Sequence, residues 1–226
     1  MKLKILAATL LLALPAASAE PPVPQLRIEP TTGGSIFYVK NVSSQPLTGF
    51  LIELVDYPGS SYALWQDEIG AEAIAPGAPG PIAPDREKRI QVGNMTVGAV
   101  PDYVKIQAAV YADGTTAGIP EKITQLIERR RFTLETVRQT IHRLEKAQEA
   151  KLSKDAMVAD LKHAIEFMQP RGGPPAVQIG LNRTAGSKVL SNAAAQLAKQ
   201  SVDETLAGLR AWESALEASK PVIGDQ

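Results

Sequence analysis

The spacing of apolar residues changes near residue 119, and this change constrains the fold more than any other feature of the chain. Before it, apolar and polar residues alternate over short runs, which is typical of strands with one buried face. After it, apolar residues recur at steps of three and four, which is typical of amphipathic helices. The first pattern is clearest in Val104, Ile106, Ala108 and Val110, and the second in Leu134, Val137, Ile141 and Leu144.

The N-terminal part is predicted to be a β-sandwich. Six or seven short runs rich in Ile, Val, Tyr and Phe lie between residues 26 and 112, with turn residues between them. Runs of this length and spacing favour two antiparallel sheets. Residues 68–88 interrupt them with Ala, Pro and Gly. Because proline has no N–H to donate, this segment is interpreted as a loop or a ragged edge.

The C-terminal part is predicted to hold about three helices. A helix of about thirty residues begins at Pro120, which suits a first helical turn. Ser153 is the expected N-cap of a shorter second helix, and Ser187 that of a long last helix. The narrow apolar stripes indicate helices packed on one another, as an antiparallel bundle or a long helical hairpin.

Strands followed by helices define a segregated α+β protein. The predicted domains are a signal peptide at 1–19, a β-sandwich at 20–118, a helical domain at 119–220 and a disordered tail at 221–226. The stretch "VYADGTTAGIPEKI" joins the two parts. It predicts a turn at Asp113–Gly114 and a helix that begins within a residue or two of Pro120.

Residues 1–19 have the pattern of a secretory signal peptide. Lys2 and Lys4 precede an apolar run, and Ala17-Ser18-Ala19 is a small-x-small cleavage site. The run is too short to span a membrane, and no later stretch is long enough. The protein is therefore expected to be exported, to the periplasm or the exterior of a bacterium.

Charge and cysteine content exclude several classes of function. Loss of Lys2 and Lys4 leaves 22 basic and 24 acidic residues, a net charge of −2. This balance gives no electrostatic reason to bind nucleic acid or an anionic membrane. The chain has no cysteine, which excludes disulfides, thiol catalysis and thiolate metal sites.

Three Asn-x-Ser/Thr sequons begin at Asn41, Asn94 and Asn182. They are interpreted as turn chemistry, because Asn, Ser and Thr gather in turns for backbone reasons. Glycosylation is the alternative that the sequence leaves open.

The runs "FYVKNVSSQPLTGFLIEL" and "VKIQAAVYADGTTAG" resemble paired strands of immunoglobulin-like or fibronectin-III-like modules in exported bacterial proteins. The resemblance covers residues 24–118 and implies an immunoglobulin-like sandwich. The Tyr-x-Cys corner and the disulfide of antibody domains are missing. Together with a helical C-terminal part, the chain resembles exported bacterial proteins of unknown function, and this resemblance implies no catalytic residue.

Catalytic, metal and cofactor motifs are missing from the sequence. It has no Gly-x-Ser-x-Gly, Ser-x-x-Lys, P-loop or Gly-x-Gly-x-x-Gly pattern. His142 and His163, its two histidines, lie beside the apolar stripes and are expected to be solvated. Asp160-x-x-His163-x-x-Glu166 is interpreted as a charged helix face, not a metal site. The sequence thus predicts a protein that is not an enzyme and needs no cofactor or metal; a hydrolase of unrecognised type is the weakest hypothesis.

Six residues are candidates for contact with a ligand or partner. Tyr57, Tyr62 and Trp65 could stack on sugar rings, although such aromatics more often pack in a core. Arg129, Arg130 and Arg131 form the strongest basic run, interpreted as a solvated helix face that would contact an acidic partner if functional.

The leading hypothesis is a protein-interaction or assembly module of the bacterial cell envelope, which binds another protein or copies of itself. The alternative is a carbohydrate-binding module that uses the three aromatics.

Overall fold

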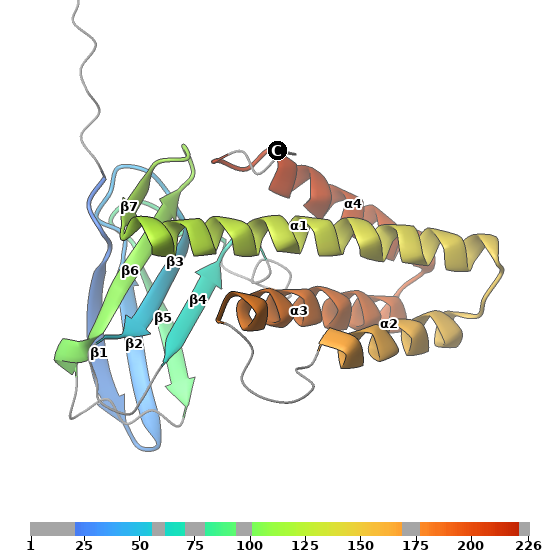
Figure 1. Cartoon of the computed structure of the whole chain (residues 1–226), viewed down its shortest axis with the longest axis horizontal. Coiled ribbons are helices and arrows are strands. Elements are labelled where there is room, and N and C mark those ends of the chain that lie inside the picture. Colours follow the sequence, from blue (N-terminus) through green and yellow to red (C-terminus); the bar gives the residue numbers. More distant parts are fainter. Residues whose placement is uncertain (1–20, 56–61, 71–79, 94–100, 169–176, 222–226) are drawn as a thin grey trace, which may run out of the picture.

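A computed structural model describes residues 21–55, 62–70, 80–93, 101–168 and 177–221. The signal peptide, Tyr57, residues 71–79 of the predicted loop and residues 222–226 of the tail therefore lie outside the described residues. Antiparallel sheets form the N-terminal part and helices the C-terminal part, which confirms the segregated α+β order (Figure 1). None of the described helices is long and apolar enough to cross a membrane.

Within the described residues, seven strands form two antiparallel sheets. The three-stranded sheet has the order β1-β2-β5, and the four-stranded sheet the order β4-β3-β6-β7. The bounds are β1 Gln25–Thr31, β2 Gly34–Lys40, β3 Leu47–Leu54, β4 Ala63–Asp67, β5 Glu87–Gly93, β6 Val104–Tyr111 and β7 Thr116–Gly118.

One apolar cluster contains side chains from both sheets. Alternation along each strand directs one set of side chains inward, where they lose contact with water. Phe37 of β2, Phe50 of β3 and Tyr111 of β6 are fully buried in this cluster. An ion pair also joins the sheets, because Lys88 of β5 contacts the buried carboxylate of Glu68, which follows β4.

The turn that joins the two parts has the predicted geometry. Gly114 has a φ of +91°, and the Asp113 carboxylate accepts bonds from the N–H (2.9 Å) and hydroxyl (2.7 Å) of Thr115. The short strand β7 then pairs with β6 and ends at Gly118. A Cβ on Gly118 would lie 2.3 Å from the carbonyl oxygen of Gln107, so only glycine fits there.

Four helices follow in the ranges that the structure describes, where the sequence predicted about three. They are α1 Pro120–Glu149, α2 Lys154–Met168, α3 Val177–Lys199 and α4 Val202–Glu217. The start of α1 at Pro120 and the cap of α2 are confirmed, since the Ser153 hydroxyl accepts from the N–H of Ala156 at 3.2 Å. The predicted long last helix is wrong: Ser187 lies inside α3, and a capping box of Ser201 and Glu204 starts α4.

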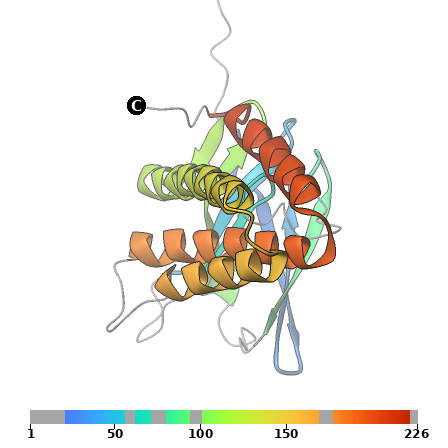
Figure 2. The same ribbon diagram turned by 90° about the vertical axis from the view of Figure 1, so that its right-hand side faces the viewer.

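The four helices share one aliphatic core. Figure 2, which looks toward the helices from the side remote from the sheets, shows them gathered around a common centre. The core is built from leucine, valine, isoleucine, alanine and methionine, and Val137, Leu161, Val189, Leu197 and Leu216 are its least exposed members. Helix α3 packs on both α1 and α2, and α4 packs on α1.

Helix α1 belongs to both parts of the molecule (Figure 1). Its N-terminal turns cover the outer face of the four-stranded sheet, where Leu126 packs with Leu51 and Val110. Its C-terminal turns carry Val137, Ile141 and Leu144 into the helical core. The two parts therefore pack together through a helix that they share.

Asn41 shows that one sequon serves a turn. Its side-chain amide donates to the carbonyls of Gln45 and Ile82, both at 2.8 Å, and its oxygen accepts from the N–H of Ser43. The residue is fully buried. Turn chemistry is confirmed here, and the amide nitrogen is not accessible for glycosylation.

Candidate functional site

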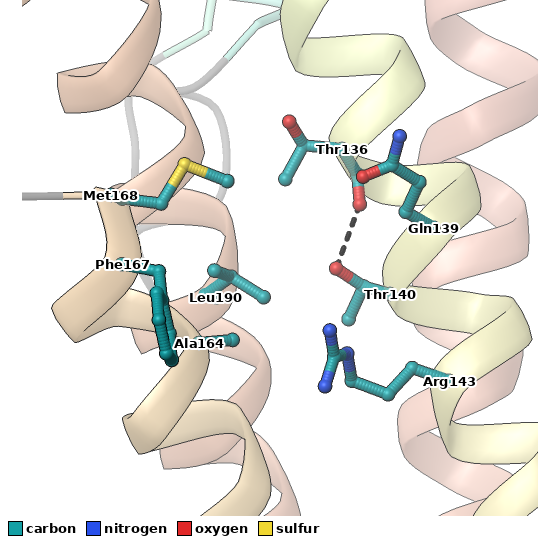
Figure 3. Close-up of a pocket in the computed structure, with 8 residues that line it drawn as sticks. All are labelled: Thr136, Gln139, Thr140, Arg143, Ala164, Phe167, Met168 and Leu190. Carbon is teal, nitrogen blue, oxygen red and sulfur yellow. Dashed lines mark hydrogen bonds between the residues drawn. The ribbon is translucent and has the colours of Figure 1, made fainter.

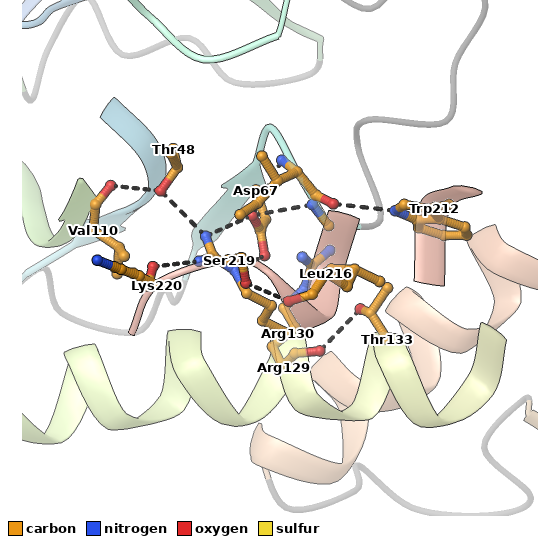
Figure 4. A network of polar contacts seen from close by, with 12 residues as sticks. Thr48, Asp67, Val110, Arg129, Arg130, Thr133, Trp212, Leu216, Ser219 and Lys220 are labelled. Atoms are coloured by element: carbon orange, nitrogen blue, oxygen red, sulfur yellow. Dashed lines mark hydrogen bonds and ion pairs between the residues drawn. The ribbon is translucent and has the colours of Figure 1, made fainter. Parts of the chain in front are cut away.

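A buried ion pair joins helix α1 to strand β4. Arg130 donates from Nε to Asp67 Oδ2 at 2.9 Å and from Nη2 to Asp67 Oδ1 at 2.8 Å. The two side chains are 1% and 0% exposed. This two-point geometry is the strongest that a carboxylate and a guanidinium can adopt. The pair lies where the outer face of the sheet meets the helices (Figure 4).

Arg130 and Asp67 also bond to groups around the pair (Figure 4). Arg130 Nη1 donates to the carbonyl of Lys220 at 3.2 Å, and Nη2 contacts Thr48 Oγ1 at 3.4 Å. Asp67 Oδ1 also accepts from the N–H of Gly70 at 3.1 Å. Since a buried charge is tolerated only when it is paired and hydrogen-bonded, these contacts let the pair stay buried. The site is closed and structural.

The arginine run was interpreted wrongly at two of its three positions. Arg129 and Arg130 are 2% and 1% exposed, so neither can contact an acidic partner at the surface. They are buried because this part of α1 faces the sheet and the C-terminal segment instead of water. Arg131 is partly exposed and pairs with Glu128 on the same helix.

The aromatic platform is also wrong for the two residues that the structure describes. Trp65 is 6% exposed and lies on the face that α1 covers. Tyr62 packs against the core between the sheets, with its ring edge-on to Phe37 at 6.5 Å, and burial raises the pKa of its hydroxyl. An exposed stacking surface for a sugar cannot be built from them. Tyr57 is outside the described residues.

The histidines occupy the solvated positions that the sequence predicted. His142 and His163 are both exposed, on α1 and α2. Asp160 accepts from Arg143 of α1, so it is occupied by an arginine instead of sharing a site with His163. Among the described residues, no three His, Asp or Glu side chains are grouped so that they could hold a metal ion.

The outer edge of β5 is a candidate surface for a partner. Among the described residues, strand β5 is last in its sheet and pairs only with β2. Main-chain N–H and C=O groups of alternate residues along its other edge therefore point away from the sheet. A hollow of about 490 Å³ runs beside it, lined by residues 80–83 and 86–89.

Two exposed arginines lie beside this edge of β5. Within the described part of the chain, neither Arg86 nor Arg89 has an ion-pair partner, whereas Arg27 pairs with Glu29 and Glu87. Unpaired guanidinium groups attract carboxylates and bind them in a two-point geometry. The edge is therefore suited to an acidic segment.

The outer face of the same sheet adds a tyrosine to this surface. Tyr38 of β2 is in register with Arg27 of β1 and Arg89 of β5. The guanidinium carbon of Arg27 lies 3.8 Å from the ring centre of Tyr38. The Tyr38 hydroxyl donates to Glu29 at 2.8 Å, and this bond is the main cause of a lowered pKa of that carboxyl. The ring is thus held in one orientation at the surface.

Sequence reasoning found β5 as a strand but missed this surface. The grouping of Arg27, Tyr38 and Arg89 depends on the pairing of three strands that are separated along the chain. Strand alternation shows that each residue lies on an outward face, but it does not show which strands are neighbours.

The chain matches no family model, and neither a curated protein nor a solved structure is similar enough to it to count as a match.

Proposed function

We propose that the protein is an exported, non-enzymatic module of the bacterial cell envelope that binds an acidic, extended segment of another protein along the free edge of β5. The carrying observation is that, in the part of the chain that the structure describes, the outer edge of β5 has no paired strand and the two arginines beside it, Arg86 and Arg89, have no ion-pair partner. An extended peptide would gain main-chain hydrogen bonds from the edge and specificity from the flanking side chains.

The finer architecture belongs to the same proposal. The two sheets would form an immunoglobulin-like sandwich, since one apolar cluster draws on both. The helices would form a bundle, since a second cluster draws on all four. In such modules a free edge strand is a common place for a partner to bind.

If the protein assembled with copies of itself, the copies would associate through a face other than the edge of β5. Pairing of β5 with β5 of a second copy would bring Arg86, Lys88 and Arg89 of both chains close together. Like charges at such distances are destabilising, which favours an acidic partner over a second copy.

The test combines capture from an envelope extract with charge reversal. Tagged protein starting at residue 20 would be compared with the variant Arg86→Glu/Arg89→Glu and with Lys105→Glu, which reverses an exposed charge on the other sheet. We expect the wild type and Lys105→Glu to retain the same partner in similar amounts. The amount that the double variant retains should be at least tenfold lower.

A photoreactive residue in place of Gln91, an exposed residue of β5, locates the contact. Cross-linking to an acidic segment of the captured partner supports the proposal. Equal capture by all three proteins would refute it, and a cross-linked dimer of this chain would favour self-assembly.

A further inference from the structure

A pocket of about 230 Å³ lies in the helical part, remote from β5 and independent of the proposed function. It opens between α1 and α2, and α3 provides its floor (Figure 3). Helices α1 and α2 each pack on α3, and the contact between Arg143 and Asp160 links them beside the pocket. The lining residues are Thr136, Gln139, Thr140, Arg143, Ala164, Phe167, Met168 and Leu190.

The two sides of the pocket differ in chemistry. Ala164, Phe167 and Met168 of α2, with Leu190 of α3, present apolar surface, whereas α1 presents polar side chains (Figure 3). Phe167 is 57% exposed, the largest exposed fraction among the large hydrophobic residues described. Ligand sites often combine apolar walls with a few fixed polar groups in this way.

The threonines of α1 show how the polar side is satisfied without a ligand. Thr136 donates its hydroxyl to the carbonyl of Phe132 at 2.9 Å, and Thr140 to that of Thr136 at 2.7 Å. Each proton is used within the helix, so each hydroxyl oxygen is left as an acceptor. Positive charge at the pocket therefore comes from Arg143 alone among its lining residues.

Asp160 holds Arg143 in place but does not use all the N–H donors of the guanidinium. Arg143 Nη1 donates to both Asp160 oxygens, at 3.0 and 2.9 Å. Nε and Nη2 have no partner within the part of the chain that the structure describes. The guanidinium points toward the space between the helices (Figure 3). An arginine fixed by one carboxylate with free donors is prepared to bind a second one.

We propose that this pocket binds a small carboxylate with an apolar tail, such as a medium-chain fatty acid. The carboxylate would accept from Arg143 Nε and Nη2, and the tail would cover Ala164, Met168 and Leu190. The volume is below the roughly 300 Å³ at which pockets for drug-sized ligands begin. At about 30 Å³ for each water-sized group, it holds roughly eight such groups. The seven-carbon tail of octanoate would therefore fit in the pocket while its carboxylate lies beside the exposed Arg143, so octanoate is the appropriate probe.

Titration of the protein starting at residue 20 with sodium octanoate, followed by calorimetry and by amide NMR, tests the site. We expect saturable binding of one octanoate, with shifts confined to residues of α1, α2 and α3 around the pocket. Octanol, which has the same chain without the charge, is expected to bind at least tenfold more weakly.

Two arginine variants separate the proposed contact from a general charge effect. Arg143→Met keeps an apolar stem and removes the charge, so it should lower octanoate affinity at least tenfold. Arg138→Met is the matched control, because Arg138 lies on the same helix but pairs with Glu213 and Glu217 of α4. It should leave the affinity within twofold of the wild type.

A third variant fills the pocket from its apolar side. Ala164→Phe should abolish binding while the thermal unfolding midpoint and the far-UV spectrum show a folded protein. Absence of saturable binding to the wild type would overturn the proposal. Equal affinity of the wild type and Arg143→Met, or shifts located outside the three helices, would overturn it as well.

Discussion

The helical core and the junction between α1 and the sheet are both buried, yet they depend on different physics. The core consists of aliphatic contacts such as those of Leu197, which is fully buried. The junction holds a charged pair, Arg130 and Asp67, with threonine and main-chain partners. Apolar contacts are individually weak and numerous, so a core loses stability in proportion to what is removed. A buried ion pair is stable only when both members are present.

The difference teaches what each region contributes. The aliphatic core supplies stability and tolerates changes that keep its volume. The ion pair contributes little net stability, because removing two charges from water offsets most of their attraction. We infer that its main role is to fix the position of α1 on the sheet, since only one placement brings the guanidinium onto Asp67.

The largest expected effect comes from removing one member of the pair. Arg130→Met leaves the Asp67 carboxylate buried without its partner, which should lower the free energy of unfolding by about 3–5 kcal/mol. Urea denaturation followed by circular dichroism measures it. The double variant Arg130→Met/Asp67→Leu leaves no unpaired charge of this pair buried, so it should regain part of the free energy of unfolding that Arg130→Met loses. A double variant as unstable as the sum of the two single variants would contradict the interpretation.

A somewhat smaller effect is expected in the core. Leu197→Ala removes apolar contacts and leaves a cavity, which should cost roughly 3 kcal/mol. Leu197→Met nearly conserves the volume and should cost less than about 1.5 kcal/mol. The same denaturation assay compares them. If Leu197→Ala and Leu197→Met were equally unstable, the stability of the core would depend on one exact side chain, as that of the junction does.

The cap that starts α4 after the break from α3 is expected to contribute about 1 kcal/mol to the free energy of unfolding. Ser201 caps α4 by accepting from the N–H of Glu204 at 3.2 Å. Ser201→Ala removes this bond, and losses at such caps are typically about 1 kcal/mol. The thermal midpoint should fall by roughly 2–4 °C for a chain of this size. Ser187→Ala, in the interior of α3, is the control and should have little effect or raise the midpoint slightly.

The smallest effect is a loss of stability in acid, shared by both parts. A bond from the Thr115 hydroxyl is the main cause of the lowered pKa of Asp113, and a bond from the Ser201 N–H is the main cause of the lowered pKa of Glu204. Because each pKa is lower in the folded state, the stabilisation is complete above the ordinary value. It is lost as the pH falls through the folded value.

Unfolding midpoints between about pH 7 and pH 3 would measure this dependence. Asp113→Asn and Glu204→Gln should each flatten the acid side of the curve slightly. A variant whose curve stays parallel to that of the wild type would show that its carboxylate does not contribute.

Local patterns predicted most of the elements. The strand around Val104, the turn at Asp113–Gly114 and the start of α1 each depend on residues that are neighbours in the sequence. The break before α4 could also have been predicted, because Ser201-Val-Asp-Glu204 is a capping-box sequence. The long apolar stripe across that point hid it.

The buried contacts between α1 and the sheet could not be predicted in the same way. Arg130 looked solvated because its partner, Asp67, lies 63 residues away and no local pattern connects them. Spacing left both a core position and an exposed platform open for Trp65, because the layer that covers it comes from α1. Burial of both residues is a consequence of packing between distant segments, which spacing along the chain does not encode.

The sharing of α1 also sets an order for folding. The four-stranded sheet ends at residue 118, but its outer face, with Leu51 and Trp65, stays open to water until the first turns of α1 cover it. During synthesis, a chain that stops at the predicted domain boundary would therefore expose apolar surface and would leave the Asp67 carboxylate without its arginine. Such half-finished species aggregate readily. The smallest part of this chain that can be expected to fold alone thus extends past residue 130, well inside what the sequence presents as the second domain.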